Sequence, residues 1–196
     1  MTISTDLTLE NDIVRLAPLE ASHRDALLKA SSDGKLWELW YTSAPSADNI
    51  DAYLTRAMAW KEEGTSMPFV VIHKASGQVI GTTRYYHVSR EHRWLELGYT
   101  WYARSHWRTG VNASCKLLLL EYAFETMGCI KVQLTTDWFN HRSRAAIARL
   151  GAHQDGILRN HQINSDGTYR DTVVFSILDR EWHGVKKNLQ LRLNAQ

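Results

Sequence analysis

The sequence lacks the patterns that mark secreted, membrane-bound and metal-binding proteins. Its two cysteines, Cys115 and Cys129, form no CxxC pair, so we expect reduced thiols in a cytoplasmic protein. No apolar run is long enough to cross a membrane, and the N-terminus has no signal-peptide pattern. Its nine histidines form no HExxH or HxxxH pattern, so we expect no metal site.

Other classes of function also lack support. There is no GxSxG elbow and no Walker lysine loop, which argues against a serine hydrolase or a P-loop nucleotidase. The formal net charge is only +2, so we expect no nucleic-acid partner. An RNA-binding interpretation, based on scattered tryptophans and arginines, has no RNP1-like run behind it.

The most informative stretch covers residues 95–128. Residues 95–102 are rich in aromatic and β-forming residues and predict a strand, followed by a polar loop over 103–111. Residues 112–127 carry apolar side chains at helical spacing and predict a helix. Asn112 is a favourable N-cap, and Gly128 stands where helices often end.

A strand, a basic loop and a helix start together favour anion binding. The first helical N–H groups have no partner within the helix, and phosphates bind there. Gly110 lets the backbone approach closely because it has no Cβ, while Arg104 and Arg108 add positive charge. The alternative is an ordinary strand-to-helix connection with solvated arginines.

The remaining elements predict one α/β domain over residues 1–196. Its sheet is mixed and mostly antiparallel, with a central parallel strand–helix–strand unit and flanking helices. A polar C-terminal tail covers 183–196, and we expect residues 186–196 to form a frayed or loosely docked helix. The expected strands lie at 12–17, 69–73, 79–88, 95–102, 131–136, 156–163 and 169–178, and the other helices at 20–30, 46–63 and 142–150.

This order of elements resembles the GCN5-related N-acetyltransferases (GNAT), and within them the RimJ/RimL-type subgroup. The resemblance covers nearly the whole chain. It rests on LELGYTW (95–101), HWRTGVNA (106–113), YAFETMGC (122–129), TTDWFNHRSRAAIARLGA (135–152) and GTYRDTVVFSILDREW (167–182).

The resemblance implies transfer of an acetyl group from acetyl-CoA to a primary amine, on a protein N-terminus or a small molecule, by direct attack in a ternary complex. It places the pyrophosphate on the backbone over 108–113 and the pantetheine arm along the end of the preceding strand. The implied cofactor-binding residues are Trp101, Tyr102, Trp107, Arg108, Thr109, Gly110, Val111, Asn112, Ala113, Asn140 and Ser143.

The chain departs from the family pattern at two places. The usual loop, Gln/Arg-x-x-Gly-x-Gly/Ala, has Trp107 and Asn112 at its first and last positions, and only Gly110 is kept. Tryptophan is, however, common at the first position in the RimJ/RimL-type subgroup. We still expect anion binding, because Asn112 can cap the helix. A tyrosine that often serves the family as general acid is replaced by Ile147.

Two residues are candidates for catalysis by this resemblance and by their positions. Glu96 could take the proton of the amine, directly or through water, or it could be a solvated strand residue. Ser143 could relay a proton to the leaving thiolate, or it could cap the helix over 142–150. Asp137 is a weaker candidate base that could only cap its loop. The oxyanion donor implied by the family is a backbone N–H near residues 99–101.

The acceptor and the partners are less well defined. We expect residues 37–41, with Tyr85 and Tyr86, to form the acceptor pocket, although these aromatics could equally form a satellite core. Arg142, Arg144 and Arg149 could reach CoA phosphates or form a solvated face. An exposed strand of the C-terminal hairpin could support a homodimer. The alternative function is an acyl-CoA-binding sensor or partner module that has lost catalysis.

Overall fold

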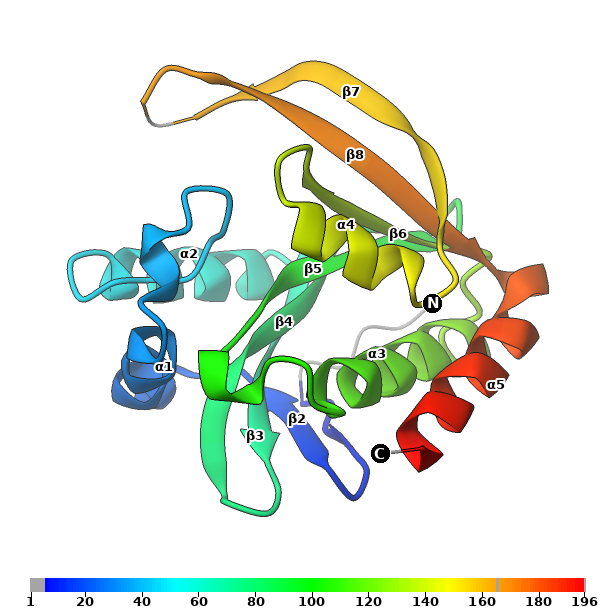
Figure 1. Cartoon of the computed structure of the whole chain (residues 1–196), viewed down its shortest axis with the longest axis horizontal. Helices are drawn as coiled ribbons and strands as arrows, with labels where there is room; N and C mark the ends of the chain where they lie inside the picture. The colour runs from blue at the N-terminus through cyan, green and yellow to red at the C-terminus, as the bar shows by residue number, and fades with distance from the viewer. Residues whose placement is uncertain (1–5, 165, 196) are drawn as a thin grey trace.

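The computed structural model describes residues 6–164 and 166–195, and its centre is one mixed β-sheet (Figure 1). The strand order is β1-β2-β3-β4-β5-β6-β8-β7, and only β5 and β6 pair in parallel among the described residues. This confirms the predicted mixed, mostly antiparallel sheet. The strands are β1 Leu9–Glu10, β2 Val14–Pro18, β3 Ser66–His73, β4 Gln78–Ser89, β5 Trp94–Tyr102, β6 Lys131–Asp137, β7 His153–Ile163 and β8 Tyr169–Leu178.

The helices cover both faces of this sheet. The α-helices are α1 Arg24–Ser32, α2 Ile50–Glu62, α3 Val111–Glu121, α4 His141–Ala148 and α5 Asp179–Asn194. Short 3-10 turns, η1 Ala21–His23, η2 Leu36–Glu38 and η3 Arg104–His106, precede or follow them, and η4 Tyr122–Thr126 is a π-helical turn. No helix in the described ranges is long and apolar enough to span a membrane.

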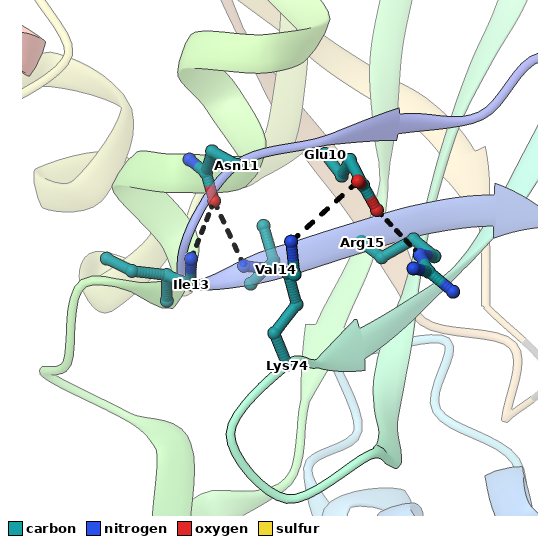
Figure 2. A network of polar contacts seen from close by, with 6 residues as sticks. All are labelled: Glu10, Asn11, Ile13, Val14, Arg15 and Lys74. Carbon is teal, nitrogen blue, oxygen red and sulfur yellow. Dashed lines mark hydrogen bonds and ion pairs between the residues drawn. The ribbon is translucent and has the colours of Figure 1, made fainter.

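The first hairpin is fixed by side chains that bind its own backbone (Figure 2). Asn11 Oδ1 accepts hydrogen bonds from the N–H groups of Ile13 and Val14, both at 3.0 Å, which closes the turn between β1 and β2. Glu10 pairs with Arg15 at 2.7 Å and with Lys74 at 3.7 Å. The second contact joins this hairpin to the turn between β3 and β4.

Two buried layers follow from the alternation of side chains along the strands. Leu95 and Leu97 of β5 belong to the core beneath α3 and α5. Trp101, farther along β5, packs in the second core with residues of α1 and α2. The alternation of side chains between the two faces of β5 shifts by one residue at Tyr99, whose φ of +50° marks a bulge. Glu96 therefore lies on the face of α2, opposite Leu95 and Leu97 as predicted.

The C-terminal segment is a longer and more firmly docked helix than the sequence predicts. Residues 183–196 were expected to form a polar tail with a frayed or loosely docked helix, whereas α5 begins at Asp179, reaches Asn194 and packs on α3, as Figure 1 shows. Trp182, Val185 and Leu189 of α5 are buried, because they repeat along one face of the helix. Lys186 adds salt bridges to Glu121 and Glu125 at 2.8 and 2.7 Å.

The predicted C-terminal hairpin is present as β7 and β8. β8 pairs with β6 from Thr172 to Leu178, while β7 is the outer strand of the sheet and extends past the other elements in Figure 1. Gly167 has φ of +84° in the connecting turn, a conformation that favours glycine. Ser165, part of the predicted turn, lies outside the described residues. Ile163 and Tyr169 at the end of the hairpin are 73% and 64% exposed.

Candidate active site

The site begins where the two parallel strands separate. β5 and β6 pair at three positions, the last of which joins Glu96 to Gln133. β5 then continues to Tyr102 and β6 to Asp137, with no further pairing between them in the described residues. The bulge at Tyr99 accounts for this, because a bulge bends the strand that carries it. Backbone polar groups on the facing strand edges are left for another partner.

The start of α3 lies beyond the end of β5 and is open. Gly110 precedes the helix, is buried, and has φ of −65°, so its conformation does not require glycine. The prediction that Asn112 caps this helix is wrong. Asn112 lies inside the first turn, and its Oδ1 accepts a 3.3 Å hydrogen bond from the Tyr102 hydroxyl. The N-cap residue Gly110 has no side chain to cap this end. Thr109 Oγ1 accepts a long hydrogen bond from the Val111 N–H at 3.4 Å, and the amides that follow Val111 can bind an anion.

Trp107 holds the loop before α3 in place. Its indole N–H donates to the carbonyl of Tyr102 at 2.8 Å, which ties the loop to the end of β5. The guanidinium of Arg142, from α4, lies 3.6 Å from the centre of the Trp107 ring, and that of Arg104 lies 5.9 Å away. These contacts bring two cations to the loop, one of them from across the strand separation.

The other two candidate arginines of α4 lie elsewhere. Arg144 stacks on Trp138 at 4.1 Å and donates to the Trp138 carbonyl at 3.2 Å. Arg149 follows the last turn of α4, where its carbonyl accepts hydrogen bonds from Asn188 and Arg192 of α5. Of the three, only Arg142 contacts the loop before α3.

Trp101 and Tyr102 were expected along the pantetheine arm, and the carbonyl groups of both already lie against other parts of the protein. The Trp101 carbonyl oxygen is turned toward Gly81 of β4, where an added Cβ would lie 2.0 Å from it. The Tyr102 carbonyl accepts the Trp107 indole N–H. A pantetheine contact at Tyr102 would therefore share that carbonyl, whose second lone pair can accept another hydrogen bond.

Glu96 is buried and paired, unlike a solvated strand glutamate. It is 8% exposed, and its Oε1 lies 2.9 Å from Nδ1 of His87 on β4. The His87 side chain is 69% exposed, so the pair joins a buried carboxylate to solvent. His87 was missed in the sequence because its contact with Glu96 depends on the register of β4 against β5. The signal that could have found His87 is the predicted hairpin between these two strands, because it brings His87 and Glu96, nine residues apart in the sequence, into contact.

Tyr86 lies beside this pair and reaches across to β6. Its ring covers Gly98, where an added Cβ would be 2.9 Å from the Tyr86 Cε1 atom. Its hydroxyl lies 3.2 Å from Oγ1 of Thr135. Burial, and then the charge of Glu96, raises the pKa of Tyr86 well above its usual value. Tyr86 therefore stays protonated and can donate a hydrogen bond.

The loop after β6 places the remaining predicted residues. Asn140 caps α4, and its Oδ1 accepts the N–H of Ser143 at 3.0 Å. Ser143 therefore does not cap the helix itself. Asp137 is 3% exposed, accepts the N–H of Phe139 at 2.8 Å and lies 3.7 Å from Arg170. These contacts match the expectation that Asp137 caps its loop.

The aromatic residues expected at the acceptor pocket divide between two places. Tyr85 is fully buried in the core beneath α3 and donates to the Leu119 carbonyl, so its assignment to the pocket is wrong. Trp40 is 59% exposed and lies 5.9 Å from Phe139, measured between ring centres. Trp40 also contacts Tyr41 at 5.5 Å. This exposed group joins the segment after η2 to the loop after β6.

Comparisons with known proteins agree on one family. Residues 14–153 match the family described as acetyltransferase (GNAT) domain. A Bacillus subtilis (strain 168) protein, YdaF, named as a candidate ribosomal N-acetyltransferase, is 30% identical over 179 residues, 90% of this chain and 96% of that one.

Solved structures show the same fold. A GCN5-related N-acetyltransferase from Brucella melitensis aligns with a TM-score of 0.87 and 30% identity, over 95% of this chain and 85% of that one. Mycobacterium smegmatis RimJ, solved in complex with CoA-disulfide, aligns with a TM-score of 0.77 and 20% identity, over 95% and 93%. The second likeness is one of fold.

Proposed function

The chain belongs to the GNAT acetyltransferase family and is therefore an acyltransferase, and we propose that it moves an acetyl group from acetyl-CoA to a primary amine. The attack is direct, in a ternary complex, and residues 1–196 act as a single N-acetyltransferase domain. One observation carries the proposal: β5 and β6 separate between the buried Glu96 and the uncapped start of α3. A long ligand with an anionic end and a reactive end suits that arrangement.

The residues at the start of α3 fit the pyrophosphate of acetyl-CoA. The open amides and the helix dipole favour negative charge there. Arg142, held against Trp107, adds a cation, and the exposed Arg108 adds another. We assign cofactor binding to Trp101, Tyr102, Trp107, Arg108, Thr109, Gly110, Val111, Asn112, Ala113, Asn140 and Ser143.

Glu96 is the proposed base. An alkyl ammonium has a pKa near ~10.4, so a proton must be removed before the nitrogen can attack a thioester. Glu96 accepts this proton, directly or through one water. His87, bonded to the same carboxylate and exposed, can then carry a proton to solvent. Acetyl-CoA supplies the thioester carbonyl that the amine attacks.

The developing charges need a donor and an acid. A backbone N–H near the bulge at Tyr99 is the proposed oxyanion donor, because the bulge turns strand amides out of the ladder. Ile147, at the position of the family tyrosine, is buried and has no proton to give. Ser143 lies one helical turn earlier on the same face and is the proposed relay to the leaving thiolate.

The acceptor is the amine of a small molecule or of a protein N-terminus. Trp40, Tyr41 and Phe139 form an exposed aromatic wall beside the strand separation, suited to an apolar group near that amine. A second copy of the chain is a further proposed partner. It would pair with β7, an outer strand that is exposed along nearly its whole length.

The first experiment tests the cofactor assignment by calorimetry. Arg142→Ala should weaken acetyl-CoA binding roughly tenfold, which corresponds to about 1.4 kcal/mol. Arg149→Ala is the matched control, because it removes the same charge from the other end of α4. Equal affinities in the two variants would remove Arg142 from the site.

A second measurement separates an enzyme from the alternative, a catalytically inactive acyl-CoA sensor. Thiol release from acetyl-CoA is followed with a panel of amines and short peptides. Release that depends on the amine supports the transferase. Tight binding of acetyl-CoA with no release for any amine supports the sensor.

A further inference from the structure

Arg84, on β4, is a deeply buried cation. It is 2% exposed, and its Nε is buried with no hydrogen-bond partner. Among the described residues no aspartate or glutamate forms a salt bridge with it. Charged side chains that are buried this deeply are normally paired, because losing water without a partner costs free energy. An unpaired Arg84 therefore needs an explanation.

Three aromatic rings surround the guanidinium and form an aromatic cage: Tyr53, Trp60 and Tyr99. The guanidinium carbon lies 4.3 Å from the ring centre of Tyr99 and 5.6 Å from those of the other two. Ring faces attract a cation. They do not replace the in-plane acceptors that the N–H groups of an arginine require. The cage thus holds the charge in place, and the buried Nε–H has no acceptor among the described residues.

Arg84 and the proposed base lie on the same face of the sheet. Arg84 is opposite Gly98 in the register of β4 and β5, and Tyr86 is opposite Glu96. Arg84 and Glu96 are therefore diagonal neighbours, which places their Cα atoms about 7–8 Å apart. They do not pair, because Glu96 is bonded to His87 and the ring of Tyr86 covers Gly98 between them.

We propose that Arg84 binds a carboxylate of the acceptor, and that the acceptor is an amino acid or a similar small zwitterion. This inference rests on the proposed function, in which Glu96 faces the amine. A carboxylate binds a guanidinium through two parallel hydrogen bonds, one of which would give the buried Nε–H of Arg84 the acceptor that it lacks. A cation and an anion at diagonal positions on one face of the sheet match the two charges of an amino acid.

Binding also requires a local movement. Arg84 is covered by Trp60 and Tyr99, which are themselves only half-buried. One of these rings must turn aside to admit a carboxylate. Trp60 then changes environment, which gives an optical signal that does not depend on turnover.

The decisive experiment compares matched acceptors. Thiol release from acetyl-CoA is measured with each standard amino acid and with its amide, which keeps the amine and removes the carboxylate. We expect at least one acid to exceed its amide about tenfold in kcat/KM. Arg84→Met should bring that ratio to about one, mainly through KM, while acetyl-CoA affinity by calorimetry stays unchanged. Arg84→Lys should recover part of the preference.

Binding is followed separately by tryptophan fluorescence. The amino acid that is the best acceptor should change the emission of the protein saturated with CoA, and Trp60→Phe should remove most of that change. A ratio near one in the unmodified protein, a ratio unaffected by Arg84→Met, or acetylation of peptides alone would overturn the proposal. Those outcomes leave the transferase intact, whereas loss of acetyl-CoA binding would overturn the proposed function instead.

Discussion

A Cβ added at Gly81 of β4 should strongly lower the stability of the fold. An added Cβ would lie 2.0 Å from the carbonyl oxygen of Trp101, 2.9 Å from Cα of Tyr102 and 3.0 Å from the carbonyl carbon of Trp101. All three are backbone atoms of β5, so no side-chain rotation can relieve the contact. Gly81→Ala must push the end of β5 away from β4.

The cost can be worked out from the contacts that would change. Overpacking in a rigid region costs about 1–3 kcal/mol, and each hydrogen bond lost between the strands adds about 1 kcal/mol. The bond from Ala103 N–H to the Ile80 carbonyl, at 2.7 Å, is next to the clash. We therefore expect Gly81→Ala to lower the free energy of unfolding by about 3 kcal/mol. For a protein of this size that lowers the melting temperature by about 6–12 °C.

Urea denaturation followed by circular dichroism measures this effect. Gly156→Ala in β7 is the control, because its Cβ would meet no atom within 4 Å, and we expect a change within about 0.5 kcal/mol. If Gly81→Ala is as stable as Gly156→Ala, the close approach of β4 to β5 is wrong. Weaker acetyl-CoA binding by Gly81→Ala would follow from the displaced end of β5.

Three further predictions concern the site and its surroundings. Gly110→Val should weaken acetyl-CoA binding in calorimetry by at least about tenfold in a folded protein, because a side chain would block close backbone approach. Glu96→Gln should slow thiol release and flatten its pH profile without changing acetyl-CoA affinity, and an unaltered profile would remove Glu96 as base. Burial lowers the pKa of Lys116 from 10.5 to about 8, so its charge destabilises the fold below pH 8 and this penalty fades as the pH rises toward 10.5. Lys116→Met should therefore stabilise the protein in urea by about 2 kcal/mol at pH 7 and by less at pH 10.

The overall fold could be predicted because each of its elements has a local signal. Apolar residues alternate along the strands and repeat at helical spacing in the central helix, and glycines mark the turns. The parallel pairing of β5 and β6 follows from a strand, a helix and a strand in sequence. These patterns involve residues close together in the sequence, so they predict helices, strands and turns without any knowledge of tertiary contacts.

The wrong assignment of Tyr85 conflicts with the alternation of side chains along a strand, while the docking of α5 has a weaker signal in the sequence. Tyr85 and Tyr86 are adjacent on one strand, so they must face opposite sides of the sheet, and only Tyr86 could line the site. The apolar residues of α5 recur at positions 182, 185 and 189, which is helical spacing within a segment of polar composition. The polar composition of the segment conceals that apolar face, so the sequence predicts only a frayed or loosely docked helix.

Other features depend on contacts that no local pattern describes. Asn112 is a favourable cap by residue type, yet the helix starts one residue earlier and Asn112 bonds to Tyr102 instead. The pairing of Glu96 with His87 depends on strand register, and the bulge at Tyr99 changes the parity of β5 midway. A sequence pattern that assumes regular strands cannot place residues beyond such a bulge.

The contacts of Trp107 explain how the loop can function with a tryptophan at the first position of the family pattern. Trp107 replaces the usual glutamine or arginine, which removes a polar side chain from the loop. Its indole N–H nevertheless binds the Tyr102 carbonyl, and its ring face holds the guanidinium of Arg142. Arg142 of α4 thus supplies a positive charge at the place where an arginine of the loop would supply it in the family pattern. If Trp107 sustains cofactor binding in this way, Trp107→Gln should weaken acetyl-CoA binding, although glutamine is usual at this position in the wider family, because the change releases Arg142. Acetyl-CoA affinity equal to or above that of the unmodified protein would show that Arg142 does not need the tryptophan.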